Sequence, residues 1–246
     1  MQYLIFTDIH GNVEAFKKVF NFAKKRNIDH YLFLGDLVGY GASPNECIQK
    51  IKTISPISIV RGNHDKAVCD GDSIQAFNPI AAAAIVWTQQ NLRKKNLNYL
   101  CDLKMGPQTI NDDITICHGT PFDEDAYIFG EFDAAEAFLH VNTKICFFGH
   151  THFPYVYSEK NGLVQGLYIT EKVKELEIKS DTRYLINPGS VGQPRDRDNR
   201  AACAIYDSKK KVIKFFRLDY NIESAQKKIL NQNLPPALAE RLSLGI

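Results

Sequence analysis

The sequence lacks any Cys-x-x-Cys pair, and its six cysteines are scattered over 246 residues. Several of them lie in apolar, strand-like surroundings, so we expect buried free thiols in a reducing cytoplasm. The six positions are Cys47, Cys69, Cys101, Cys117, Cys146 and Cys203.

Long apolar runs are also missing. Nothing approaches the roughly 18 uninterrupted apolar residues that a membrane span requires. Residues 1–8 have no basic flank, so they predict a first strand rather than a signal peptide. We therefore expect no membrane partner and a cytoplasmic location.

Neither sign of charge dominates. The 30 basic and 28 acidic residues leave a net charge of +2, which singles out neither nucleic acid nor a membrane surface as a partner. No linker-like stretch divides the chain, and its length suits one domain over residues 1–246. A homo-oligomer is compatible with this composition.

The first half of the chain alternates strand and helix signals. Strands are predicted at 3–7, 31–34 and 57–61, with helices after Asn12 and at Pro44, where Ser43 and Glu46 form a capping-box pattern. Alternation of this kind indicates βαβ crossovers and a largely parallel sheet.

Later segments change in character. A long helix is predicted from 78 to about 95, and strands at 114–117 and 145–148. After residue 152 short strands joined by turns predominate, including an exposed hairpin near 174–179. We predict an α/β fold in which a second, more antiparallel sheet packs on the first.

Five motifs rich in acids, amides and imidazoles follow the predicted strands. They are Asp8-Ile9-His10, Gly35-Asp36, Gly62-Asn63-His64-Asp65, His118-Gly119 and Gly149-His150-Thr151-His152. Strand ends of this kind would gather the side chains at one edge of a sheet. In extended backbone, Asp8 and His10 would point to the same side, as would His150 and His152. The mixed set favours first-row transition ions over magnesium or calcium, and it indicates a two-metal hydrolase.

This ordered signature resembles that of the calcineurin-like metallophosphoesterases, which include small bacterial and archaeal phosphodiesterases. The resemblance covers about residues 1–206 and implies a four-layer αββα sandwich with two mixed sheets and a metal site at strand carboxyl ends. It also implies two divalent metal ions, drawn from Mn, Fe, Zn and Ni. The implied ligands are Asp8, His10 and His152 for one ion, Asn63, His118 and His150 for the other, and Asp36 as a bridge.

The resemblance sets His64 apart as a catalytic group near the leaving oxygen, oriented by Asp65. With a hydroxide bridging the metals as nucleophile, His64 could protonate the leaving alkoxide or stabilise charge on the phosphoryl oxygens. The sequence leaves both roles open. Arg61 and Arg195 are candidates for bidentate phosphate contacts, and the alternative for each is an ordinary surface arginine.

The function expected from these observations is a phosphodiesterase acting on a small phosphorylated or nucleotide-type substrate. Alternatives are a phosphomonoesterase or protein phosphatase, and a non-catalytic interaction scaffold, which the presence of His64 disfavours. No basic stripe supports a nuclease. The loop aromatics Tyr40, Phe77, Phe122 and Tyr127 could stack on a nucleobase or serve as packing groups.

Overall fold

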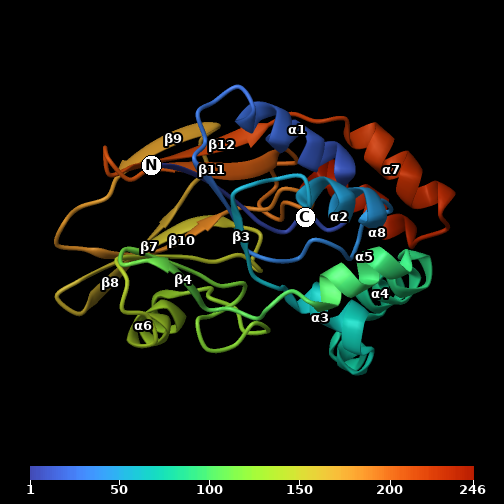
Figure 1. Ribbon diagram of the computed structural model, residues 1–246, viewed down its shortest axis with the longest axis horizontal. Coiled ribbons are helices and arrows are strands. Elements are labelled where there is room, and N and C mark those ends of the chain that lie inside the picture. Colours follow the sequence, from blue (N-terminus) through green and yellow to red (C-terminus); the bar gives the residue numbers. More distant parts are fainter.

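The protein is a sandwich of two mixed sheets with helices on its outer faces. The structure, a computed structural model, describes residues 1–246 apart from the side chains of residues 72 and 73. In this described chain, two six-stranded sheets stack face to face, and eight α-helices accompany them (Figure 1). The predicted α/β fold with two mixed sheets is confirmed.

The first sheet has the strand order β3-β2-β1-β11-β12-β9. Its parallel part is formed by β1, β2 and β3, and the remaining strands run antiparallel to their neighbours. The strands are β1 (Gln2–Phe6), β2 (His30–Phe33), β3 (Ile57–Ile59), β9 (Val173–Glu177), β11 (Ala201–Asp207) and β12 (Val212–Leu218).

The second sheet has the order β4-β5-β6-β10-β7-β8, with β5, β6 and β10 parallel to one another. Its strands are β4 (Gln108–Asn111), β5 (Ile114–Ile116), β6 (Ile145–Phe147), β7 (Pro154–Lys160), β8 (Leu163–Tyr168) and β10 (Arg183–Pro188).

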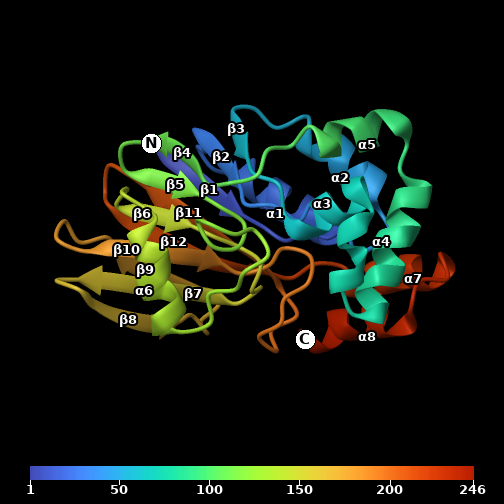
Figure 2. The same cartoon turned by 90° about the horizontal axis from the view of Figure 1, so that it is seen from below.

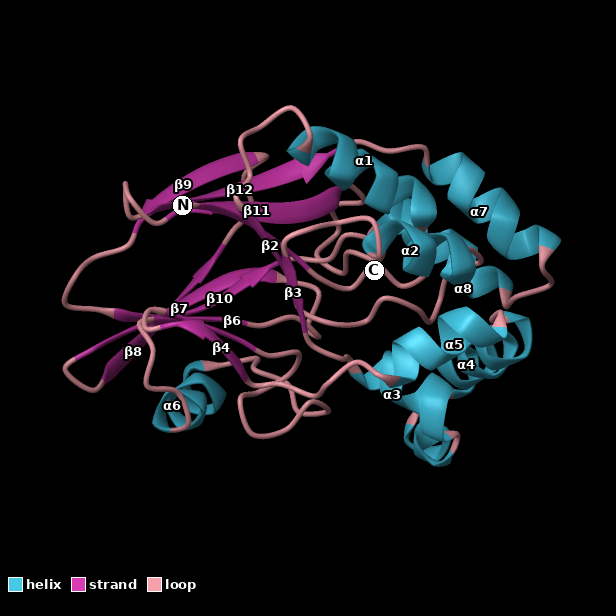
Figure 3. Cartoon of the chain, in the orientation of Figure 1, coloured by secondary structure: helices cyan, strands magenta, loops and turns pink.

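Most helices gather at one end of the sandwich, beyond the ends of the strands (Figures 2 and 3). The α-helices are α1 (Val13–Ala23), α2 (Pro44–Ile51), α3 (Asn63–Asp70), α4 (Pro79–Asn91), α5 (Lys94–Cys101), α6 (Glu131–Leu139), α7 (Ile222–Asn231) and α8 (Pro236–Leu244), and a 3₁₀ helix, η1, spans Asp72–Ala76. No helix of the described chain is both long enough and apolar enough to cross a membrane.

The side chains of strand β1 alternate between two hydrophobic cores, one on each face of the first sheet. Tyr3 and Ile5 face the core between the two sheets, whereas Leu4 and Phe6 face the core beneath α1 and α2. A third core lies between the second sheet and α6. Since β1 is buried on both faces, its sequence is a continuous apolar run rather than an alternating one.

The prediction of one long helix over 78–95 is wrong, because the chain forms two helices there, α4 and α5. Asn45 explains the break: its side-chain amide donates to the carbonyl of Asn91 at the end of α4, and its oxygen accepts from the N–H of Arg93 before α5. This partner lies on α2, so the local sequence gives no sign of it. The Ser43 side chain, predicted to cap α2, makes no capping hydrogen bond, although α2 does begin at Pro44.

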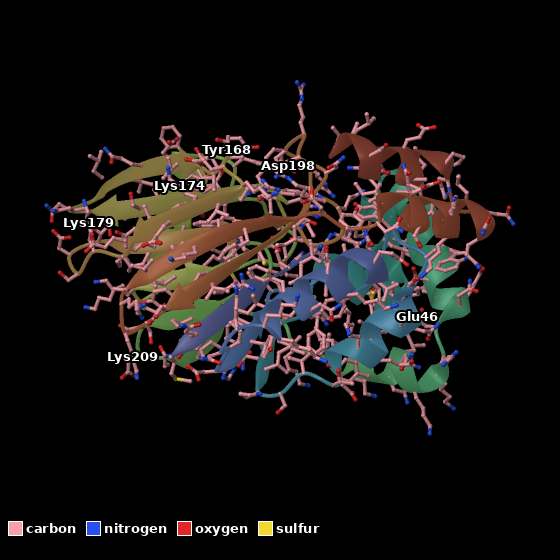
Figure 4. All side chains as sticks on the ribbon, turned by 90° about the horizontal axis from the view of Figure 1, so that it is seen from above. Glu46, Tyr168, Lys174, Lys179, Asp198 and Lys209 are labelled. Carbon is pink, nitrogen blue, oxygen red and sulfur yellow. A yellow bond between two sulfur atoms is a disulfide. The ribbon has the colours of Figure 1, made fainter. Side chains whose placement is uncertain are left out.

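Two further predictions need correction. Cys69 on α3 and Cys101 on α5 form a disulfide, so four of the cysteines, not six, are buried free thiols. The segment around 174–179 is no hairpin of its own but the edge strand β9, which pairs with β12. Lys174 and Lys179 lie at the strand-rich end of the molecule, away from the helices (Figure 4).

Candidate metal centre

The predicted ligands are contributed by both sheets. Asp8 and Asp36 follow the parallel strands β1 and β2, and Asn63 begins α3 shortly after β3. His118 and His150 follow β5 and β6 of the second sheet. The expectation of one sheet edge was therefore wrong: the carboxyl ends of parallel strands from two stacked sheets meet here.

The backbone at five of the seven predicted ligands is left-handed, not extended. The φ angle is +53° at Asp8, +48° at His10, +59° at Asp36, +66° at His150 and +64° at His152. Residues other than glycine rarely adopt this conformation, which costs on the order of 1–3 kcal/mol each. The side chains thus converge through turns that the surrounding fold imposes, and the predicted alternation of an extended strand does not apply.

Two groups of ligating atoms share one carboxylate. In each group the atoms lie within 4.8 Å of one another. One group comprises Asp8, His10, Asp36 and His152, and the other comprises Asp36, His118 and His150. The Nε2 atoms of His10 and His118 each lie 3.4 Å from Oδ2 of Asp36. Asn63 extends the second group, since its Oδ1 lies 3.1 Å from Nε2 of His118.

In each of the four predicted ligand histidines, one ring nitrogen lies within hydrogen-bond distance of a main-chain carbonyl oxygen. The pairs are His10 Nδ1 with Val38 O at 3.2 Å, His118 Nδ1 with Leu34 O at 2.8 Å, His152 Nδ1 with Gln193 O at 2.5 Å, and His150 Nε2 with Asp125 O at 3.1 Å. Such a bond fixes the tautomer and leaves the other nitrogen free to bind a metal. Three histidines therefore offer Nε2 to the centre, and His150 offers Nδ1.

The buried oxygens of the site fit a divalent cation. Oδ2 of Asp8 and Oδ2 of Asp36 are buried and accept no hydrogen bond from the described residues. An unpartnered buried carboxylate oxygen is costly unless a cation lies beside it. The donor set of carboxylate, imidazole and amide also suits first-row transition ions.

Protonation states are consistent with this fit. Burial lowers the pKa of His10 and His152 well below the usual value, and that of His150 to about 3, so these rings are neutral as metal binding requires. Burial alone would lower the pKa of His118, but the negative charge of Asp36, 3.4 Å away, outweighs it and raises that pKa to about 10. Metal binding at His118 would therefore release a proton.

Known proteins match this chain over nearly its whole length. The family model described as the calcineurin-like phosphoesterase superfamily domain matches residues 1–211. The chain belongs to this superfamily. An uncharacterized protein of Methanocaldococcus jannaschii is 39% identical over 250 residues, which cover 98% of this chain and 97% of the relative.

Solved structures agree with the family. The metallophosphoesterase of Sphaerobacter thermophilus is 37% identical, with a TM-score of 0.89 and coverage of 100% of this chain and 99% of that one. A hypothetical protein of Pyrococcus horikoshii OT3, 20% identical, shares the fold with a TM-score of 0.82 and coverage of 100% and 98%. The protein is thus a metallophosphoesterase, an enzyme of a metal-dependent family that acts on phosphorylated substrates.

Next to the metal groups of this phosphoesterase, His64 makes a different contact from the one predicted. Its Nε2 lies 3.1 Å from the hydroxyl of Tyr40. Burial lowers the pKa of His64 to about 4. The ring also packs edge-on against Phe77, with the ring centroids 4.8 Å apart.

The Asp65 carboxylate makes no hydrogen bond to His64 in the described structure. It accepts instead from four main-chain N–H groups, those of Asp36, Leu37, Val38 and Gly62. Asp65 therefore fixes the backbone of the turn that carries Asp36, and any influence on His64 is indirect.

Replacing Asp65 with alanine should lower the free energy of unfolding by at least about 3 kcal/mol, because it leaves buried N–H groups unpaired. Urea denaturation of the metal-free proteins would measure this difference. A loss below 1 kcal/mol would contradict the structural role.

The two predicted phosphate-binding arginines have different environments. Arg61 is paired with the buried carboxylate of Glu124, with Nη2 2.6 Å from Oε1 and Nε 3.2 Å from Oε2. Arg195 donates from Nη2 to the Tyr40 hydroxyl at 3.2 Å and lines the pocket above the metal groups. Of these two arginines, Arg195 lines that pocket and Arg61 does not.

A pocket of about 450 Å³ opens over the metal groups. Three of the four loop aromatics line it, namely Tyr40, Phe77 and Tyr127, and Tyr127 stacks on His150 with the centroids 3.9 Å apart. Phe122 packs against His140 instead. Arg241 of α8 also lines the pocket, and no sequence motif indicates it because α8 lies far along the chain from every motif.

Proposed function

We propose that this protein is a two-metal phosphodiesterase for small phosphorylated or nucleotide-type molecules. The observation that carries the proposal is the pair of ligating groups that share Asp36 at the base of the pocket beside His64. We assign Asp8, His10 and His152 to one ion and Asn63, His118 and His150 to the other, with Asp36 between them.

The bound ions would supply Lewis acidity and an activated water for attack on phosphorus. The side chains of the protein would orient the substrate and neutralise the charge of its phosphate. His64 lies at the pocket wall, and burial keeps its ring neutral in the free protein. It would donate a proton to the leaving oxygen once the negative charge of a bound phosphate raises its pKa, and its other candidate role is to stabilise charge on the phosphoryl oxygens. Since the Tyr40 hydroxyl accepts from Arg195, its own proton is available to Nε2 of His64.

The size of the pocket favours a small substrate. About 450 Å³ lies within the usual range for small-molecule sites. Aromatic walls and Arg195 suit a phosphate attached to a flat group.

The helices α7 and α8 pack around Tyr40 together with α4, which supports treating residues 1–246 as one domain.

Metal removal should abolish the activity. Chelation followed by dialysis is expected to reduce hydrolysis of bis(p-nitrophenyl) phosphate to background, and manganese or nickel should restore it, because the ions supply the charge that stabilises the transition state. Bound metal should also stabilise the fold. At a free metal concentration of 100 times Kd, the free energy of unfolding should increase by about 2.7 kcal/mol, and the unfolding midpoint should rise accordingly. Absence of diester and monoester hydrolysis with Mn, Fe, Zn and Ni alike would refute the proposal.

A further inference from the structure

We propose that Arg195 and Arg241 bind a second phosphoryl group, carried by the part of the substrate that leaves. The substrate class would then be phosphoanhydrides such as nucleoside diphosphates and their esters, in which the leaving group is itself a phosphate. This inference rests on the proposed function and specifies the substrate of the same site.

The two guanidinium groups converge on one aromatic ring. Their Cζ atoms lie 5.9 Å (Arg195) and 5.6 Å (Arg241) from the centroid of the Tyr40 ring. Both arginines line the pocket that opens over the metal groups. Nε of Arg195 and the terminal nitrogens of Arg241 remain as N–H donors for phosphate oxygens, since Nη2 of Arg195 contacts Tyr40 and Nε of Arg241 contacts Ile246.

Neither arginine is paired with an Asp or Glu side chain among the described residues, and Nε of Arg241 donates to the main-chain oxygen of Ile246 at 2.8 Å. Other arginines of the chain, half-buried or buried, are paired with acidic side chains: Arg61–Glu124, Arg183–Glu159, Arg200–Asp198 and Arg217–Asp196. Nε of Arg195 is buried and donates no hydrogen bond within the described structure. Burial, followed by the positive charge of Arg195, lowers the pKa of Arg241. Two neighbouring cations with no acidic side chain paired to either of them repel each other, and a bound anion would relieve that repulsion.

The position of Arg241 is fixed by the docking of α8. The N–H of Arg197 donates to the carbonyl of Gly245 at 2.7 Å, and Asn199 Nδ2 donates to the carbonyl of Ser243 at 3.0 Å. These bonds hold the end of α8 against the loop that carries Arg195. Asp198 of that loop lies where the strands meet the helices (Figure 4). Since the family model ends at residue 211, Arg241 comes from the part of the chain beyond it.

The arginines lie on the His64 side of the pocket. Tyr40 contacts both His64 and Arg195 through its hydroxyl, so the second phosphate would sit beside the group placed near the leaving oxygen. In the hydrolysis, water oxygen bonds to the attacked phosphorus and the bond to the bridging oxygen breaks. That oxygen keeps the electron pair and departs on the second phosphate with a proton that derives from water. The arginines would neutralise the charge that develops there.

Calorimetric titration of the manganese-loaded protein with pyrophosphate and with orthophosphate tests this site. The wild type should bind pyrophosphate at least about ten-fold more tightly than orthophosphate, because only pyrophosphate reaches both the metals and the arginines. Arg241→Gln keeps the aliphatic stem and helix propensity but removes the charge, so it should lose most of this preference, as charge-assisted hydrogen bonds are lost. Arg195→Gln should act in the same direction.

Arg93→Gln is the matched control, since the exposed Arg93 does not line the pocket and the change in net charge is the same. Removal of manganese by pyrophosphate would affect wild type and variants alike. The difference in anion preference between wild type and variants therefore measures the contribution of the arginines. An unchanged preference in both folded variants, or equal binding of the two anions by wild type, overturns the inference. The preference can persist in a protein that hydrolyses no ester, and that result would refute the proposed function but not the anion site.

Discussion

Replacing Asp36 with asparagine is expected to lower kcat/KM for bis(p-nitrophenyl) phosphate by about 1000-fold or more. Asp36 is the one carboxylate common to both ligating groups, and its Oδ2 is buried without a hydrogen-bond donor. Burial alone would raise the pKa of Asp36, but the neighbouring His118, His64 and His10 hold that pKa well below its usual value, so the group is an anion. Loss of this charge should cost several kcal/mol of transition-state stabilisation.

The metal content of the Asp36→Asn protein should fall from two ions per chain toward one, as measured by elemental analysis after gel filtration. The exposed Asp102 provides a control, because Asp102→Asn makes the same chemical change outside the pocket. Two tightly bound ions and near wild-type kcat/KM in Asp36→Asn would contradict the assigned bridge.

Replacing His64 with glutamine should lower kcat by 10²- to 10⁴-fold while both metals stay bound, because the ring contacts the pocket but belongs to neither ligating group. The dependence on leaving group separates its two candidate roles. A proton donor matters little for p-nitrophenolate and much for an alkoxide, so the loss should grow with the pKa of the leaving group. A charge-stabilising His64 would give the same loss for both substrates. Unchanged kcat with every substrate would exclude His64 from the chemistry.

The sequence determined the ligand types and their order because these depend on short-range patterns. The apolar run of residues 3–6 predicts β1, and Asn12 caps α1 as expected through a hydrogen bond to the N–H of Ala15 at 3.1 Å. The motif Gly-His-x-His after β6 likewise placed His150 and His152 at a strand exit. Such signals lie within a few residues of the elements they specify.

Other features arise from contacts between distant segments. The partners of Asp65 and the pairing of Arg61 with Glu124 depend on how loops from two sheets meet. The break between α4 and α5 depends on Asn45 of α2, and the disulfide on the packing of α3 against α5. None of these partners is adjacent in sequence, so composition and periodicity do not predict them.

The sequence by itself determined that this chain can gather carboxylate, amide and imidazole ligands at strand ends, since residue type and spacing suffice for that. The tertiary structure decided how they converge. Left-handed backbone at Asp8, His10 and Asp36 is unfavourable in isolation and persists because the packed sheets hold it. Tertiary packing also brought Arg241 to Arg195, because only the docking of α8 places two such distant residues on one tyrosine ring.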